Sequence, residues 1–301
     1  MRLNHKVINE LMVHPGTPAG LGRRSTSETR ADWLGSTGRS NPKSVAEQDL
    51  DESKKELESA QELLYADDTW ALLLIFQGLD AAGKDGTIKH VMSGVNPQGC
   101  EVFSFKQPST EELRHDFLWR CAKVLPERGR IGTFNRSYYE EVLVVRVHPE
   151  LIAQQHLPSG SEVDSRLWQG RYDDINNFEH HLRRNGTRVV KFFLHISKEE
   201  QRRRLLARLD DPAKQWKFSP ADVAERSHFD AYQQAYEEAL TATSTSWAPW
   251  YVIPADQKPA ARALVGAIVV SSIDELGLHV PSVGEEQTRE IEKARRTLAE
   301  E

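Results

Sequence analysis

Cysteine and long apolar runs are scarce in this chain, and their scarcity excludes several classes of protein. Among 301 residues there are only two cysteines, Cys100 and Cys121, so neither a disulfide framework nor a cysteine-rich zinc site is expected. The longest purely apolar run, residues 71–76, is far shorter than the roughly 20 residues that a membrane span needs. The N-terminus also lacks the apolar centre of a signal peptide. We therefore expect a soluble, cytoplasmic protein with no membrane partner.

An excess of positive charge is also absent. The formal net charge is −6, with 28% charged and 39% hydrophobic residues. This balance argues against a dedicated nucleic-acid-binding protein, although it leaves room for a local basic site that takes a polyanion. The apolar fraction is too high for a wholly disordered chain, and the length suits one large domain or two small ones.

The chain divides into a long central region and two less regular ends. Residues 1–45 contain many glycines and serines without an apolar period, which predicts an irregular N-terminal extension. Residues 45–66 carry leucines at helical spacing, which predicts an amphipathic helix that docks on the core or forms a dimer arm. The charged residues 281–301 predict a loose or helical C-terminal tail, so the folded domain is expected at residues 46–280.

Short apolar runs predict the buried strands of this domain, at residues 70–76, 130–134, 189–195 and 250–253. Helical stretches separate them, at residues 87–92, 109–124, 173–184, 198–209, 220–243 and 258–276. Strands that alternate with helices indicate right-handed crossovers and a parallel sheet. The expected fold class is therefore α/β, a three-layer α/β/α sandwich with a central parallel sheet.

The most informative segment, the phosphate loop, is residues 78–87, GLDAAGKDGT, which follows the first predicted strand and opens a helix. Its Gly-x-x-x-x-Gly-Lys spacing is typical of phosphate binding. Its glycines let backbone N–H groups turn toward phosphate oxygens, while the helix N-terminus and the Lys84 ammonium add positive charge. The residues assigned to this loop are Gly78, Asp80, Ala81, Ala82, Gly83, Lys84, Asp85, Gly86 and Thr87.

Two carboxylates in the phosphate loop indicate a metal ion. Asp85 replaces the usual serine or threonine after the lysine, and Asp80 lies inside the loop. Both would repel a phosphate unless a cation lay between them, so we expect Mg²⁺ or Mn²⁺ held partly by Asp80. Asp85 has two interpretations: it is a metal ligand, or it is a helix-start residue stabilised by the helix dipole.

A second polar segment follows the predicted strand at residues 130–134. Ligands of open parallel sheets bind beyond the carboxyl ends of the strands, so Asn135 and Arg136 are expected to face the phosphate loop. The guanidinium of Arg136 matches phosphate oxygens. The alternative for Arg136 is a structural ion pair with Glu140 or Glu141.

A cation-rich segment follows residue 198 and is interrupted at Pro212. A helix that leaves a parallel strand, breaks at proline and continues with cations is typical of a mobile lid over phosphates, expected at about residues 205–228. An elongated row of cations suits a polyanion better than one compact nucleotide tail. The cations assigned to the lid are Arg204, Arg208, Lys214 and Lys217.

Taken together, these motifs resemble the polyphosphate kinase 2 family, a branch of P-loop kinases similar in fold to thymidylate kinase. The resemblance covers roughly residues 45–278. The matching segments are GLDAAGKDGT at 78–87, GVNPQG at 94–99, FLWR at 117–120, FNRSYYEEVLVVRV at 134–147, KFFLHISKEEQRRRL at 191–205 and TSTSWAPWYVIPADQK at 243–258.

The resemblance implies phosphoryl transfer between inorganic polyphosphate and nucleotides, with a divalent metal ion and a helical lid. It implies that Asp80 positions the metal and the attacking phosphate, that Lys84 holds the phosphates being exchanged, and that Arg136 completes the catalytic set. Many relatives have Asp-Arg where this chain has Asn135 and Arg136; the Asn-Arg-Ser form resembles the subgroup that accepts both AMP and ADP. It implies that the four lid cations line a polyphosphate channel. The expected partners are adenine nucleotides, with guanine left open, and the chain is expected to form a homo-oligomer.

Three rival interpretations remain at this stage. An ATP-dependent nucleoside or nucleotide kinase would share the phosphate loop but needs no long cationic row. A non-catalytic nucleotide-binding protein would bind nucleotide without turnover, and the presence of Asp80, Lys84 and Arg136 counts against it. A nucleic-acid binder would need aromatic residues among the arginines of the basic helix, and the chain has none there.

Overall fold

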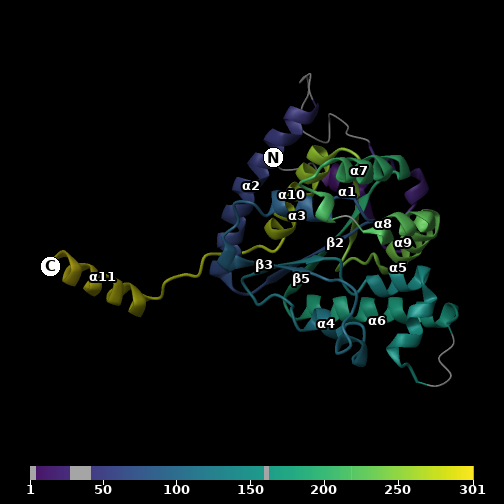
Figure 1. Ribbon diagram of the computed structural model, residues 1–301. Helices are drawn as coiled ribbons and strands as arrows, with labels where there is room; N and C mark the ends of the chain where they lie inside the picture. The colour runs from purple at the N-terminus through teal and green to yellow at the C-terminus, as the bar shows by residue number, and fades with distance from the viewer. Residues whose placement is uncertain (1–4, 28–41, 159–162, 218, 301) are drawn as a thin grey trace.

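The computed structural model describes residues 5–27, 42–158, 163–217 and 219–300 (Figure 1). One sheet holds six strands in the order β1-β6-β5-β2-β4-β3. The strands are β1 (Met12–Val13), β2 (Ala71–Gln77), β3 (Cys100–Ser104), β4 (Ile131–Asn135), β5 (Thr187–His195) and β6 (Trp250–Pro254). All four strands predicted from apolar runs are present, and the sequence missed only the short edge strands β1 and β3.

The sheet is parallel except at one edge. β2 lies at its centre, with Leu74 opposite Thr133 of β4 and Val190 of β5. β3 and β6 continue the parallel pairing, and only β1 runs antiparallel, beside β6. Every residue of β2 and β6 is buried, which explains why these strands have no polar alternation in the sequence. The carboxyl ends of β2, β4 and β5 consequently meet at one edge of the sheet.

Helices cover both faces of the sheet. α2, α3 and α10 pack together on one face, and α5, α6 and α9 pack together on the other (Figure 1). None of the helices within the described residues is long and apolar enough to cross a membrane. The α-helices are α1 (His5–Leu11), α2 (Pro42–Asp67), α3 (Lys84–Val91), α4 (Trp119–Ala122), α5 (Glu140–Val147), α6 (Ser165–Arg184), α7 (Lys198–Asp210), α8 (Pro220–Glu225), α9 (Phe229–Thr243), α10 (Lys258–Asp274) and α11 (Glu285–Ala299). The 3₁₀ turns are η1 (Leu21–Arg23), η2 (Pro97–Gly99), η3 (Glu112–Arg114), η4 (Pro149–Gln155), η5 (Gln215–Lys217) and η6 (Arg226–His228).

The helix predicted at residues 45–66 docks on the core. It forms α2, which packs along α10 with Leu57 and Leu64 buried. Gly266 of α10 makes this approach possible, because a Cβ there would lie 3.2 Å from the Ser53 Cβ of α2. α11 is different: it projects away from the body (Figure 1), and none of its residues is buried.

The expectation of an irregular extension at residues 1–45 is wrong for residues 5–27. These residues form α1, β1 and η1, and α2 already begins at Pro42. Val7, Leu11 and Val13 are buried, and β1 pairs Val13 with Trp250. Elements this short give no apolar period that a sequence window could detect, and the contact with β6 is what orders them. Residues 28–41 of the predicted extension lie outside the described residues.

The prediction of one helix at residues 109–124 is also wrong. A reciprocal cap forms at its first turn, where Ser109 N donates to Glu112 Oε2 (2.7 Å) and Glu112 N donates to Ser109 Oγ (3.2 Å). Only the turn η3 follows this cap, because the backbone is extended at His115. Asp116 then accepts a hydrogen bond from Leu118 N (2.9 Å). This second local cap competes with a continuous helix. The broken segment leads into the short helix α4.

A fully buried ion pair between β5 and α6 stabilises the β4–α5 turn. Lys191 Nζ of β5 lies 2.6 Å from Glu179 Oε2 of α6, and both side chains are 0% exposed. Tyr138 and Tyr139, from the β4–α5 turn, each donate a hydroxyl hydrogen to Glu179 Oε1 at 2.9 Å. Burial raises the pKa of the Glu179 carboxyl and lowers that of the Lys191 amine, while the ion pair opposes both shifts.

We predict that Lys191→Met lowers the free energy of unfolding by about 3–5 kcal/mol, because Glu179 is left charged and unpaired in the core. Adding Glu179→Gln should restore part of this loss, since the amide oxygen still accepts bonds from the two tyrosines. Urea unfolding followed by circular dichroism measures both variants. Arg202→Met, which removes an exposed ion pair with Glu199, is the control and should stay close to the wild type. An unchanged midpoint for Lys191→Met would contradict the prediction.

Candidate functional site

The phosphate loop joins β2 to α3 at the carboxyl edge of the sheet, as its sequence predicts. Gly78 has φ 155°, and a Cβ there would lie 3.0 Å from the Leu194 carbonyl oxygen of β5. Only glycine lets the loop approach β5 this closely. Gly83 is left-handed, with φ 106°, and it starts α3. Ala82 N closes the turn onto Leu79 O (3.0 Å).

The site holds two of the four non-glycine residues with positive φ among the described residues. They are Ala81 in the phosphate loop, with φ 63°, and Arg136 after β4, with φ 65°. A left-handed conformation costs a non-glycine residue on the order of 1–3 kcal/mol, and such residues cluster at functional sites. The surrounding contacts therefore hold both residues in conformations that they would not adopt alone.

Lys84 lies beneath the phosphate loop and is 8% exposed. Its Nζ donates to Gly78 O (2.7 Å) and Leu79 O (3.3 Å). Burial lowers the pKa of Lys84, and the neighbouring Arg136 cation lowers it further, whereas Asp80, Glu140 and Asp85 raise it. A bound phosphate would favour the charged ammonium in the same way as these carboxylates do.

Arg136 connects the phosphate loop to α5. Its Nη2 lies 2.8 Å from Asp80 Oδ1, and its Nη1 lies 3.2 Å from Glu140 Oε2. The Glu140 charge raises the pKa of Arg136, so the guanidinium is permanently charged. The sequence left open whether Arg136 faces the phosphate loop or pairs with Glu140, and the structure shows that it does both. Its side chain is 36% exposed, which leaves it accessible to a ligand.

Asn135 and Asp85 also meet, because Asn135 Nδ2 donates to Asp85 Oδ1 at 2.8 Å. Asp85 lies in the first turn of α3, where its charge complements the helix dipole. Gly86 and Thr87 continue this turn, with Thr87 buried and its N–H bonded to Gly83 O (2.9 Å). The N–H group of Thr87 therefore belongs to the hydrogen bonds of α3.

The residues present suit a magnesium ion that is shared with phosphates. Asp80 and Asp85 both belong to the phosphate loop, and no group of three or more histidine, cysteine or acidic side chains that could hold a metal occurs among the described residues. Mg²⁺ keeps several waters and commonly takes one or two carboxylates together with substrate phosphates. Two carboxylates at a phosphate loop fit that pattern, whereas an all-protein cage does not.

Arg204 contradicts its assignment to a lid that lines a polyphosphate channel, since it is only 7% exposed. Its Nη1 donates to Ala81 O (3.1 Å) and Ala82 O (2.8 Å), and its Nη2 donates to the carbonyl groups of residues 255–256. Its Nε donates to Glu200 Oε1 at 2.7 Å. The expectation is wrong because this side of α7 packs on the phosphate loop. Arg204 joins the loop to the end of β6, and we refer to these bonds as the Arg204 clamp.

The other predicted lid cations lie beyond this clamp. Arg208 is half-buried near the end of α7. Lys214 is exposed and pairs with Asp211. Lys217 ends η5, and its side chain and residue 218 lie outside the described residues. The segment predicted as one helix at residues 220–243 is divided into α8, η6 and α9.

A cavity of about 480 Å³ opens beside Arg136, between α5 and the segment that leads to α4. Arg120, Arg171 and Glu140 line it together with Arg136. The Arg120 and Arg171 side chains are each 10% exposed, and the Arg171 guanidinium lies 4.5 Å from the centre of the Phe117 ring. The cavity has the size of a small-molecule site, and cations, carboxylates and aromatic rings line it.

Sequence reasoning assigned no role to three residues that the structure places at the site. Arg120 lines the cavity, Gln201 Nε2 donates to Asp80 O (3.1 Å), and Asp256 belongs to the Arg204 clamp. Arg120, Gln201 and Asp256 all lie in the segments that carry the family resemblance, at residues 117–120, 191–205 and 243–258. The resemblance was therefore the available signal, but it did not separate supporting residues from ligand-binding ones.

Comparisons with known proteins identify the family of this chain. The family model Polyphosphate kinase 2 (PPK2) matches residues 40–279. The chain is 54% identical over 242 residues to an ADP-polyphosphate phosphotransferase from Rhodopseudomonas palustris, covering 80% of this chain and 84% of that protein. It is 48% identical over 227 residues to an AMP/ADP-polyphosphate phosphotransferase from Meiothermus ruber, covering 75% of this chain and 80% of that protein.

A comparison with solved structures identifies the same family from the fold. A crystal structure of Polyphosphate Kinase 2 from Arthrobacter aurescens TC1 matches with a TM-score of 0.85 and 38% sequence identity, covering 98% of this chain and 97% of that chain. The central sheet and the phosphate loop are therefore those of a P-loop kinase, as the sequence predicted. With a family model matched over most of its length and two relatives near half identity, the chain belongs to the polyphosphate kinase 2 family.

Proposed function

We propose that this chain transfers phosphoryl groups between inorganic polyphosphate and the nucleotides AMP and ADP. The position of Arg136 carries the proposal, because its guanidinium contacts the phosphate loop through Asp80 and also lines the cavity of about 480 Å³. A nucleotide in that cavity would present its terminal phosphate to Arg136, next to the loop that takes the other phosphate. The names of the relatives support this pair of substrates.

The reaction needs positioning and charge neutralisation more than covalent chemistry by the protein. An oxygen of the nucleotide phosphate attacks the terminal phosphorus of polyphosphate. The new P–O bond forms as the bond to the next phosphate of the chain breaks, and polyphosphate leaves one unit shorter. No side-chain nucleophile is required, since a nucleotide phosphate is ionised near neutral pH.

Lys84 and Arg136 supply fixed positive charge on the two sides of the transferred group. Without a substrate, Lys84 is bonded to loop carbonyls and Arg136 to Asp80 and Glu140. Phosphate oxygens can replace these acceptors with little rearrangement, because both cations already point at the loop. Such preorganised donors stabilise the charge that develops during transfer.

A divalent cation, Mg²⁺ or Mn²⁺, completes the proposal, with Asp80 as its protein ligand. When bound, it would neutralise phosphate oxygens that the two cations do not reach. Asp80 then needs to exchange Arg136 for the metal, which its 30% exposed side chain permits. The homo-oligomeric state, the cytoplasmic location, the use of guanine nucleotides and the absence of a nucleic-acid partner stay predictions.

A product assay tests the proposal directly. The protein is incubated with Mg²⁺, polyphosphate and AMP, ADP, GMP or GDP in turn, and the products are separated by chromatography. We expect AMP to yield ADP and ADP to yield ATP. Lys84→Ala should lower kcat about 100- to 1,000-fold, the loss seen when one oxyanion donor is removed, while the fold is retained. Formation of nucleotide products from ATP and a nucleoside, but never from polyphosphate, would favour the rival kinase function instead.

Metal dependence can be assigned to one side chain. Asp80→Asn keeps a hydrogen-bond acceptor for Arg136 but removes the charge that holds the cation. We expect a loss of activity on the order of 100-fold at low Mg²⁺, partly recovered as the Mg²⁺ concentration rises. Titrating the rate with Mg²⁺ and Mn²⁺ measures this shift. If the variant has the parent's activity and metal requirement, Asp80 is structural only.

The lid can be tested through the length of the donor. Arg208→Ala/Lys214→Ala should raise KM for long polyphosphate severalfold and leave the nucleotide KM nearly unchanged, because only a long chain reaches both cations. The effect should shrink with triphosphate and at high salt, where exposed phosphate contacts are screened. Arg202→Ala/Arg203→Ala is the matched control, since both arginines are exposed and paired within α7. Equal shifts for polyphosphate and nucleotide would reject a polyphosphate channel.

A further inference from the structure

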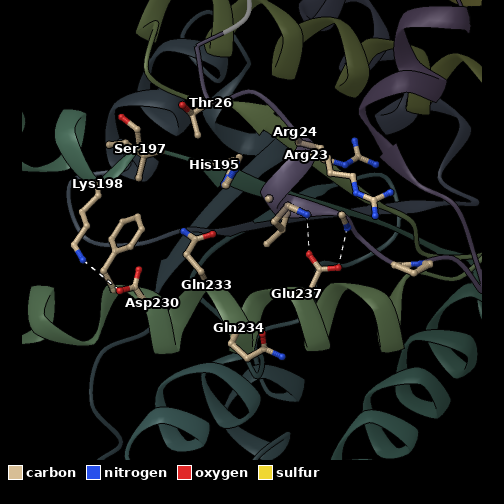
Figure 2. Close-up of a pocket in the computed structure, with 16 residues that line it drawn as sticks. Arg23, Arg24, Thr26, His195, Ser197, Lys198, Asp230, Gln233, Gln234 and Glu237 are labelled. Atoms are coloured by element: carbon tan, nitrogen blue, oxygen red, sulfur yellow. Dashed lines mark hydrogen bonds and ion pairs between the residues drawn. The ribbon is translucent and has the colours of Figure 1, made fainter.

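A further cavity lies away from the phosphate loop. It measures about 820 Å³ and lies at the carboxyl end of β5, between the N-terminal segment and one face of α9 (Figure 2). Residues 18–26, the β5–α7 turn and α9 supply its walls. No residue of the phosphate loop lines it, so it is distinct from the site described above.

Two buried nitrogen atoms in this cavity have no partner. His195 is 6% exposed, and its Nδ1 makes no hydrogen bond within the described structure; the same holds for the buried Nε2 of Gln233 on α9. Figure 2 shows both side chains directed into the space between the N-terminal segment and α9. An unpaired polar atom in the interior is costly, and native structures keep few of them. His195 from β5 and Gln233 from α9 both line this cavity, so a ligand between them would complete their hydrogen bonds.

The charges around the cavity are divided between its wall and its mouth. Arg24 donates to the carbonyl groups of residues 10–12 and Ala19, and Glu237 accepts from the N–H groups of Gly20 and Leu21. Both side chains are therefore hydrogen-bonded within the fold. At the mouth, Lys198 lies 3.4 Å from Asp230 and is half exposed.

Arg23 is the free charge at this mouth. It is exposed, and no ion pair to it is found in the described part of the chain. Burial lowers the pKa of His195, so the interior presents a neutral imidazole and an amide. The rim presents the Arg23 guanidinium and the ion pair of Lys198 with Asp230.

We propose that this cavity binds a nucleotide at a second site, with the base inside and the phosphate at the mouth. An imidazole nitrogen and an amide N–H can together satisfy the hydrogen-bonding edge of a heteroaromatic base. Leu21, Ile196 and Phe229 supply apolar wall for its ring. Arg23, which is exposed and lines the cavity, is placed to take a phosphate. The volume of about 820 Å³ lies within the range of small-molecule sites.

The second site also touches the supports of the phosphate loop. Thr26 Oγ1 and Ser197 N both donate to the carboxylate of Asp256, at 2.7 and 2.9 Å, and Asp256 O belongs to the Arg204 clamp. Phe229 lines both this cavity and the small space beside Asp80. These contacts place the second site next to the catalytic cleft but do not depend on the proposed reaction.

Equilibrium dialysis of radiolabelled AMP, without polyphosphate, tests the second site. The wild-type protein should bind two AMP per chain, and Arg136→Ala should keep one. Gln233→Leu, which removes the unpaired amide, should weaken that second binding at least tenfold. Gln169→Leu, on an exposed face of α6, is the control and should bind as the wild type does. One AMP per chain in the wild type, with none left in Arg136→Ala, overturns the proposal. If Arg136→Ala still binds two AMP per chain, Arg136 does not bind the nucleotide in the catalytic site. That result would not contradict the second site.

Two further measurements separate a ligand site from a structural role. Without nucleotide, Gln233→Leu should melt at the wild-type temperature or above it, because it loses an unpaired buried group; a lower Tm with unchanged AMP binding overturns the proposal. Arg23→Ala changes an exposed residue and cannot compromise the core. This variant should weaken the binding of AMP severalfold and leave the binding of adenosine unchanged. If both ligands are affected equally, or neither is affected, the phosphate does not bind at the mouth and the proposal is overturned.

Discussion

The Arg204 clamp is the interaction on which the functional edge of this molecule depends. One guanidinium donates to carbonyl groups of the phosphate loop and of the segment after β6, and it is paired with Glu200. The loop includes a left-handed alanine, which isolated peptide would avoid. By binding the carbonyl groups of Ala81 and Ala82, Arg204 holds the loop in this conformation. A charge that the sequence assigns to substrate is thus used to build the site.

The cations and the carboxylates of the catalytic cleft compensate one another's charge. Lys84 and Arg136 are close enough to repel each other, and Asp80 and Glu140 offset that repulsion in the absence of substrate. In the proposed reaction, substrate phosphates would take over the same role, so that binding would exchange one set of anions for another and create no new uncompensated charge. The buried pair of Glu179 and Lys191 gives this exchange a rigid base, since its tyrosine partners belong to the turn that carries Arg136.

Much of the architecture could be predicted because the central strands are buried on both faces and appear as plain apolar runs. The phosphate loop could be predicted because its glycines are required by backbone geometry. The short strand β1 could not, since its order comes from β6, about 240 residues away. Periodicity also could not distinguish Arg204 from Arg208: both lie on one face of α7, and only packing decides that the first is buried and the second half-buried. Family resemblance identified the right segments but not the direction of each side chain.

The Arg204 clamp also has a consequence for how the site comes into being during synthesis. The phosphate loop is complete in the chain by residue 87, yet the groups that fix its shape are Arg204 and the carbonyl groups of residues 255–256. A growing chain on the ribosome therefore carries the loop long before it can close it. Affinity for phosphates should arise only when the last parallel strand has joined the sheet, so unfinished chains do not compete with finished protein for nucleotide or polyphosphate.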